Sequence, residues 1–116
     1  MNLRLNVTIM SGVEDGQHLD YSADNGDGQF DGDKWTISIG RREDRDIWLR
    51  HDIYVSRQHA YLHCQNDLWS LEDCDSTNGT FIEDNNKDEA VAGTIAIMPG
   101  ILFRVGRTWL RIDPLE

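Results

Sequence analysis

The sequence has no long hydrophobic run, and its mean hydropathy is -0.56. A membrane-spanning helix needs about 20 consecutive apolar residues, so the composition excludes one. The first six residues alternate between polar and apolar side chains, which is typical of a strand and not of a signal peptide. We therefore expect a cytoplasmic protein that does not bind a membrane.

Cysteine is also scarce, because the chain contains only Cys64 and Cys74. Two cysteines do not make a disulfide framework. If a turn follows the strand that ends near Cys64, this residue faces Leu68 or Trp69 on the next strand. In the same register Cys74 lies near His59, too far away for a bridge. We expect both cysteines to be small buried side chains in a reducing compartment.

Basic residues are few, since 11 Lys and Arg stand against 21 Asp and Glu and give a formal net charge of -10. A protein that binds DNA or RNA needs a basic surface, because phosphate neutralisation supplies much of the affinity. The sequence therefore argues against a nucleic-acid partner. Five of the 11 basic residues nevertheless gather in one part of the chain: Arg41, Arg42, Arg45, Arg50 and Arg57.

Helical periodicity is absent as well, since no window of about a dozen residues repeats apolar side chains at helical spacing. Short alternating runs with glycine-containing turns instead predict an all-β fold, an antiparallel β-sandwich with its binding loops at one end. At 116 residues the chain has room for a single domain, 1–116. The polar stretches 22–33 and 83–89 are predicted to be loops. We expect strands at 3–9, 18–21, 35–39, 47–49, 60–64, 68–71, 81–82, 94–97, 101–105 and 108–112.

Three polar clusters stand where a predicted strand meets a polar segment. Loops that leave neighbouring strands at one end of a sandwich can converge, so the clusters are candidates for one site on a rigid scaffold. Two arginines, a serine, a threonine and an asparagine suit the binding of a phosphate attached to a peptide. The clusters are Gly40-Arg41, Ser56-Arg57-Gln58-His59-Ala60 and Ser76-Thr77-Asn78-Gly79-Thr80-Phe81.

In this order and at these separations the clusters resemble the motifs of the forkhead-associated (FHA) domain, a module that binds phosphothreonine peptides. The resemblance covers essentially the whole chain, and no motif position departs from the family's pattern. It implies a β-sandwich of eleven strands that grips a phosphorylated threonine of a partner protein, with no catalytic activity, cofactor or metal. The matching motif residues are Gly40-Arg41, Ser56 with His59, and Asn78-Gly79.

The resemblance also implies a role for each motif residue. Arg41 presents a planar fork of donors that matches a phosphate, and the Ser56 hydroxyl can donate to a phosphate oxygen. Arg57 adds charge or contacts the peptide, and the Thr77 hydroxyl either reaches the phosphate or braces the turn. Asn78 offers a donor and an acceptor that hold the main chain of the ligand. Three further residues support the site structurally: Gly40, His59 and Gly79.

Two other functions fit parts of the same pattern. An FHA fold can serve as an assembly or oligomerisation module without phosphate, although such a relative has no reason to keep the whole set of phosphate-binding residues. Ser56 and His59, with Asp73 or Asp75, can be read as a hydrolase triad. No G-x-S-x-G elbow accompanies them, so we predict a protein that is not an enzyme.

Metal binding finds little support in the sequence. Residues 25–31 resemble part of an EF-hand loop, but that pattern needs acidic residues at the positions held by Ala23 and Lys34. His63 and Cys64 are neighbours in a predicted strand and therefore point to opposite faces. We expect a flexible loop at 25–31 and no metal site.

Residues beyond the phosphothreonine are expected to contact variable loops, including 42–54 and 83–89. Within the first of these, Arg50, His51 and Tyr54 are candidate specificity contacts. If the acidic segment 83–89 approaches the site, it favours basic side chains after the phosphothreonine. The domain can also be part of a longer chain, and signalling through a Ser/Thr kinase is the setting we expect.

Overall fold

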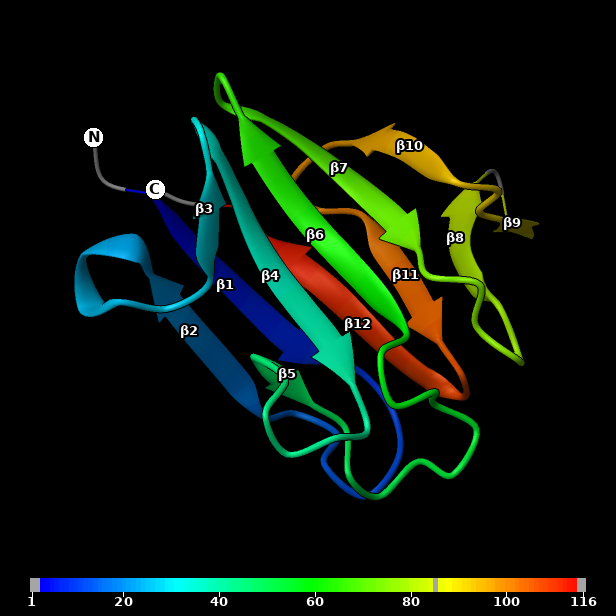
Figure 1. The fold of residues 1–116 in the computed structure, drawn as a ribbon. Helices are drawn as coiled ribbons and strands as arrows, with labels where there is room; N and C mark the ends of the chain where they lie inside the picture. The colour runs from blue at the N-terminus through cyan, green and yellow to red at the C-terminus, as the bar shows by residue number, and fades with distance from the viewer. Residues whose placement is uncertain (1–2, 85, 115–116) are drawn as a thin grey trace.

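The computed structural model describes residues 3–84 and 86–114, which fold into two β-sheets packed face to face (Figure 1). The first sheet contains β1 (Arg4–Ile9), β2 (His18–Ser22), β8 (Thr80–Asp84), β9 (Lys87–Ala90), β11 (Leu102–Val105) and β12 (Thr108–Asp113). Its strands follow the order β2-β1-β12-β11-β8-β9.

The second sheet contains β3 (Gln29–Asp31), β4 (Lys34–Gly40), β5 (Ile47–Trp48), β6 (Ala60–Gln65), β7 (Leu68–Asp73) and β10 (Thr94–Ile97). Five of these strands follow the order β10-β7-β6-β4-β3, and β5 pairs with the end of β4. The β4–β5 pairing is parallel, whereas the neighbouring β4–β6 and β6–β7 pairings are antiparallel.

The core lies between the sheets and is formed by strands whose side chains alternate between inside and outside. In β4, Trp35, Ile37 and Ile39 are fully buried, whereas the residues between them are only half-buried. β12 repeats the pattern, because successive side chains of a strand point to opposite faces. The buried indole of Trp35 keeps a hydrogen-bond partner, since its Nε1 donates to the carbonyl oxygen of Asp27 at 2.8 Å.

The predicted antiparallel sandwich is confirmed, and the described residues form twelve strands in place of the expected eleven. Two of the predicted loops are wrong. The segment 22–33 contains a 3-10 helix, η1 (Ala23–Asn25), followed by β3. Of the segment 83–89, residues 83–84 belong to β8 and residues 87–89 to β9, whereas residue 85 lies outside the described residues. Every residue of β3 and β9 is exposed. Neither strand has a buried face, so its sequence does not alternate between apolar and polar residues.

Both cysteines are free thiols, as expected. Cys64 pairs with Trp69 across the β6–β7 ladder, and the Cys74 N–H donates to the carbonyl oxygen of His59 at 2.9 Å. The predicted register is therefore correct. Cys64 is buried, whereas Cys74 is only half-buried, and burial raises the pKa of both thiols. Among the described residues there is no helix of the length and apolar character needed to cross a bilayer.

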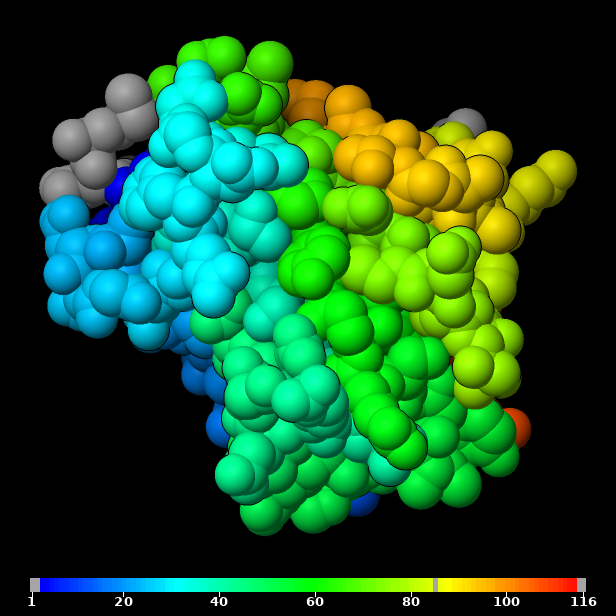
Figure 2. All heavy atoms as spheres, in the orientation of Figure 1, coloured from blue at the N-terminus to red at the C-terminus, as the bar shows by residue number. Residues whose placement is uncertain are grey.

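The loops that carry the three polar clusters lie toward one end of the sandwich. Figure 1 shows the β4–β5, β5–β6 and β7–β8 loops toward the lower end, and the β6–β7 turn at the upper end. In the space-filling view the teal and green atoms of residues 41–59 form the lower end of the molecule (Figure 2). The sandwich therefore holds the candidate residues on a common rim.

The alternating burial predicts how unevenly substitutions in the sheets will affect stability. We expect Leu62→Ala, at a fully buried position of β6, to lower the free energy of unfolding by about 2–5 kcal/mol, because it removes apolar contacts and leaves a cavity. Urea denaturation measures this. Leu68→Ala is the matched control, because Leu68 is 74% exposed, and it should change the free energy by less than about 0.5 kcal/mol. Equal losses in both variants would contradict the assigned core.

Candidate functional site

The β4–β5 loop and the end of the β5–β6 loop meet at Gly40. A Cβ atom at this glycine would lie 2.0 Å from the carbonyl oxygen of Arg57, so only a residue without a side chain fits there. Next to it, the Arg41 N–H donates to the carbonyl oxygen of Ser56 at 3.0 Å. The Gly40-Arg41 motif therefore allows two loops to run side by side as an extension of the sheet.

Arg41 is held by the main chain of the β5–β6 loop. Its Nε donates to the carbonyl oxygen of Val55 at 3.0 Å, and its own carbonyl oxygen accepts a hydrogen bond from Trp48 Nε1 at 3.0 Å. The residue is exposed, and within 3–84 and 86–114 its two terminal guanidinium nitrogens make no hydrogen bond. The side chain thus has a fixed direction and free donors.

Ser56 connects the β5–β6 loop to the β7–β8 loop. Its Oγ accepts a hydrogen bond from the Thr77 N–H at 3.2 Å, which leaves the hydroxyl hydrogen of Ser56 available for another acceptor. Thr77 itself is exposed. The Ser56 hydroxyl of one loop therefore lies against the main chain of Thr77 in another loop.

Asn78 is fixed in the same way as Arg41, by a main-chain acceptor. Its Nδ2 donates to the carbonyl oxygen of Tyr54 at 2.9 Å, while the residue stays exposed. Gly79 follows with a φ of +87°, a conformation that side chains disfavour. Three consecutive residues of one loop, the segment 54–56, thus contact Asn78, Arg41 and Thr77.

His59 lies beneath these loops and is fully buried. Its Nδ1 accepts a hydrogen bond from the Ser56 N–H at 2.9 Å, and its Nε2 lies 2.9 Å from the carbonyl oxygen of Gly79. An N–H can only donate and a carbonyl oxygen can only accept, so both bonds require the neutral ring with its hydrogen on Nε2. Burial lowers the pKa of His59, in agreement with this neutral form.

Two aspartates that the sequence reasoning did not assign to the site hold its loops. Asp73 accepts hydrogen bonds from the hydroxyls of Ser76 at 2.6 Å and Thr80 at 2.7 Å. Asp52 accepts one from the Tyr54 N–H at 2.9 Å and another from the Thr108 hydroxyl at 2.7 Å. The spacing of Asp52 and Tyr54 is that of an Asx turn, a signal that sequence inspection can find.

The hydrolase triad considered from the sequence does not form. The Ser56 hydroxyl oxygen accepts from the Thr77 N–H, both nitrogens of His59 face main-chain groups, and the Asp73 carboxylate bonds Ser76 and Thr80. His59 therefore does not contact the hydroxyl that it would have to deprotonate.

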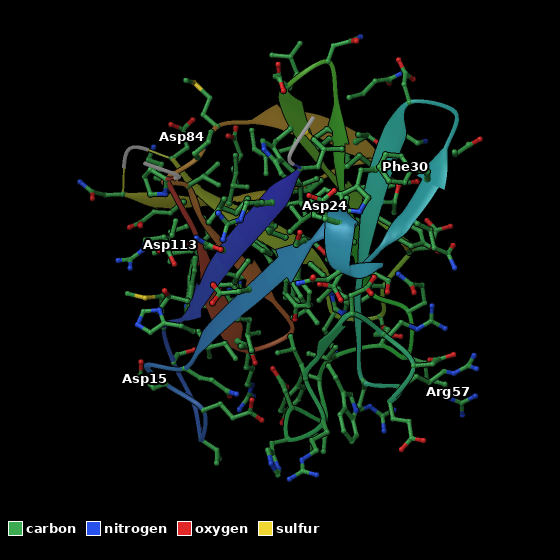
Figure 3. The ribbon with its side chains drawn as sticks, turned by 90° about the vertical axis from the view of Figure 1, so that its left-hand side faces the viewer. Asp15, Asp24, Phe30, Arg57, Asp84 and Asp113 are labelled. Carbon is green, nitrogen blue, oxygen red and sulfur yellow. The ribbon has the colours of Figure 1, made fainter. Side chains whose placement is uncertain are left out.

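Arg57 differs from the other predicted site residues. Its carbonyl oxygen packs against Gly40, but its side chain is exposed and lies at the periphery of the molecule (Figure 3). No ion pair of Arg57 is present in the described part of the chain. The structure thus brings Arg41, Ser56, Thr77 and Asn78 together, whereas no contact joins the Arg57 side chain to them in the described part of the chain.

The described residues of the acidic segment, 83–84 and 86–89, are remote from these loops. The β8–β9 hairpin turns between Asp84 and Lys87, which pair with each other, whereas the loop that ends at Gly79 joins the other end of β8. Asp88 in this hairpin forms an ion pair with Arg104 at 3.6 Å. The condition for a preference for basic side chains after the phosphothreonine is therefore not met.

The part of the chain that carries these loops matches a known protein family. The family model described as the FHA domain matches residues 37–106. The FHA domain-containing protein FhaB of Mycobacterium tuberculosis is 35% identical over 79 residues, which make up 67% of this chain and 47% of FhaB. The chain thus spans about half the length of this curated relative.

Solved structures of FHA domains share the fold. The FHA domain of the CT664 protein from Chlamydia trachomatis superposes with a TM-score of 0.75 at 22% identity, covering 98% of this chain and 100% of that one. A structure described as an analysis of phosphothreonine-dependent FHA domain interactions gives a TM-score of 0.71 at 21% identity, covering 98% and 99% of the two chains. At these identities the likeness concerns the architecture alone.

Because His59 is buried and hydrogen-bonded as a neutral ring, we expect the free energy of unfolding to fall at acidic pH. The unfolded chain binds a proton at the ordinary pKa of about 6.5, whereas the folded protein binds it only at lower pH. Stability is therefore complete above about pH 6.5 and falls as the pH drops, by at most about 1.4 kcal/mol per pH unit from this residue. Urea denaturation at a series of pH values between about 5 and 8 measures the slope.

His59→Gln should lose this contribution, so its slope should be shallower than that of the unmodified protein although the variant is less stable. His51→Gln, at an exposed histidine, serves as the control and should keep the slope. Parallel pH profiles for the unmodified protein and His59→Gln would show that His59 is not the titrating group.

Proposed function

This chain belongs to the FHA-domain family, and on that premise we propose that it binds phosphothreonine-containing segments of partner proteins. The observation that carries the proposal is the segment 54–56, which fixes Arg41, Thr77 and Asn78 around one patch of surface. Three loops there offer a guanidinium, two hydroxyls and an amide on a rigid scaffold. Association with a partner would then depend on its phosphorylation.

The phosphate is proposed to lie between Arg41 and the two hydroxyl groups. A phosphothreonine carries close to two negative charges near pH 7, and three phosphate oxygens accept hydrogen bonds. Arg41 donates from its free terminal nitrogens, and Ser56 and Thr77 donate their hydroxyls. Charge-assisted bonds of this kind contribute about 1.5–3 kcal/mol each. Arg57 adds positive charge from the rim.

Asn78 is proposed to hold the main chain of the ligand. One of its two Nδ2 hydrogens is used on Tyr54, which leaves the other hydrogen and the Oδ1 acceptor for a peptide group. Because the side chain is already fixed, binding does not have to order it. The preference for phosphothreonine over phosphoserine rests on one methyl group, worth about 1 kcal/mol by burial.

The net charge of -10 opposes the approach of a phosphate at long range. At physiological salt this repulsion is screened over about 8 Å, whereas the donors act in direct contact. Arg41 therefore decides binding at short range, and we expect a dissociation constant of micromolar order for a short peptide.

We further propose that the chain is a single interaction domain over 1–116 and not an enzyme. Both nitrogens of its buried histidine are engaged by the main chain, which supports a structural role. The unpaired thiols of Cys64 and Cys74 suit the reducing cytoplasm. Attachment to further domains in a longer protein fits the partial coverage of FhaB.

Substitution of Arg41 tests the proposal. An oriented phosphothreonine peptide library first supplies a binding peptide, which is then titrated calorimetrically. Arg41→Ala should weaken binding by about 10- to 100-fold, because a charge-assisted contact with the phosphate is lost. Arg42→Ala is the matched control, since the neighbouring guanidinium pairs with Asp44 at 3.0 Å, and it should bind almost normally. Equal affinity of all three proteins would refute the role of Arg41.

Treating the partner proteins with phosphatase distinguishes phosphate-dependent binding from assembly that needs no phosphate. The immobilised domain should capture partners from a lysate, and treatment of the lysate with phosphatase should abolish the capture. Arg41→Ala should lose the same partners. Partners that the Arg41→Ala variant retains after phosphatase treatment would favour a phosphate-independent module.

A further inference from the structure

The β11–β12 turn lies against the segment 54–56 of the β5–β6 loop (Figure 1). In this turn Gly106 has a φ of +60°, and a Cβ atom there would lie 2.8 Å from Val55 Cγ2 and 2.9 Å from the carbonyl carbon of Tyr54. A side chain at this position would therefore push the segment away. A fourth loop, which none of the three polar clusters of the sequence includes, thus contacts the segment around which the site is built.

The carboxylate of Asp52 joins the segment to this turn. Its Oδ1 accepts a hydrogen bond from the Tyr54 N–H at 2.9 Å, and its Oδ2 accepts from the Arg107 N–H at 2.8 Å and the Thr108 hydroxyl at 2.7 Å. The main-chain carbonyl oxygen of Asp52 also accepts from the Val55 N–H at 3.1 Å. Because the two carboxylate oxygens belong to one planar group, the main chain at Tyr54 is fixed relative to the turn.

The β11–β12 turn is itself anchored to the first sheet. Arg104 of β11 donates from Nη1 to the carbonyl oxygen of Gly106 at 2.8 Å. Its guanidinium carbon lies 4.2 Å from the centre of the Phe81 ring and 5.5 Å from the centre of the Trp109 ring. Cation–π contacts of this kind stabilise one position of the side chain. The support that Asp52 receives therefore belongs to the sheet.

The main chain at Tyr54 connects this support to Asn78. The peptide group between Tyr54 and Val55 accepts from Asn78 Nδ2 at 2.9 Å through its carbonyl oxygen, and its N–H is the one that donates to the Asp52 carbonyl oxygen. The peptide group before it donates to the Asp52 carboxylate. Because peptide groups are planar, fixing their N–H groups also fixes the direction of the carbonyl oxygen that Asn78 contacts.

The next peptide group has a different support. Its carbonyl oxygen, on Val55, accepts from Arg41 Nε at 3.0 Å, whereas its N–H, on Ser56, donates to the buried His59 at 2.9 Å. Arg41 and Asn78 are thus oriented by adjacent peptide groups that have separate anchors.

We propose that Asp52 is a positioning residue of the phosphothreonine site, which acts through the Tyr54 carbonyl group on Asn78 and makes the β11–β12 turn a fourth loop of the site. The inference rests on the proposed function, because it concerns the contact between Asn78 and the main chain of the ligand. It separates two tasks: Asp52 prepares the contact with the peptide, and His59 prepares the contact with the phosphate.

A double-mutant cycle tests the assignment. Asp52→Asn keeps the size of the side chain but replaces one acceptor oxygen by an NH₂ group, so it should weaken binding of the phosphothreonine peptide by about fivefold. In the Asn78→Ala background the same substitution should change the affinity by less than about 1.5-fold, because the side chain that Asp52 positions is gone. In the Arg41→Lys background it should again weaken binding by about fivefold. Calorimetric titration measures the affinities, and urea denaturation verifies that each variant is folded.

Asp113→Asn is the matched control. The Asp113 carboxylate also accepts from a threonine hydroxyl, that of Thr8 at 2.6 Å, but it lies at the end of β12 that is remote from the turn. This variant should lose stability and keep its affinity for the peptide. If Asp52→Asn does not fold, Thr108→Val removes only the hydroxyl that the Asp52 carboxylate accepts from, and it should show the same coupling to Asn78 at about twofold.

Three results would overturn the inference and leave the proposed function intact, because Arg41→Lys would still weaken binding. The first is an unchanged affinity in Asp52→Asn. The second is an equal loss of affinity with and without Asn78, which would show a general effect on the fold. The third is a coupling to Arg41 as strong as that to Asn78, which would show one shared anchor. If no phosphothreonine peptide binds to the unmodified protein, the proposed function fails and the inference fails with it.

Discussion

The buried imidazole of His59 joins the β5–β6 and β7–β8 loops by accepting from the Ser56 N–H and donating to the Gly79 carbonyl group. Both partners belong to the main chain, so the ring fixes the separation of the two loops and not merely the position of a side chain. Above it, the Ser56 hydroxyl oxygen and the Thr77 N–H complete the junction. The exposed donors of Arg41 and Asn78 are thus presented by a scaffold that is already ordered, which lowers the entropy that a ligand must remove.

Strands with one buried face were predictable from the sequence, because their apolar residues occur at every second position. β4 and β12 follow this rule, and so does the β6–β7 register that placed Cys64 opposite Trp69. β3 and β9 were missed because they are edge strands whose residues are all exposed. Such strands are formed by pairing with a neighbour, and hydrophobic alternation carries no information about them.

The residues of the candidate site were predictable from the sequence, but the hydrogen bonds that hold them were not. The motifs named Arg41, Ser56 and Asn78, and the structure gathers them around one segment. The acceptors that hold Arg41 and Asn78 are main-chain carbonyl groups, which every residue possesses and which leave no trace in the sequence. The sequence suggested Asp73 only as a member of a catalytic triad. Its bonds to the hydroxyls of Ser76 and Thr80 were not predicted, because both residues also fit a simple turn.

Carbonyl oxygens keep their chemistry whichever amino acid carries them. The oxygen of Tyr54 that holds Asn78 would survive an exchange of the aromatic ring for another side chain, since the bond does not involve the ring. The ring, in contrast, packs against Arg107, whose guanidinium carbon lies 3.8 Å from the ring centre. An exchange of the side chain at position 54 would therefore change the surface beside Asn78 and leave in place the acceptor that fixes the Asn78 amide.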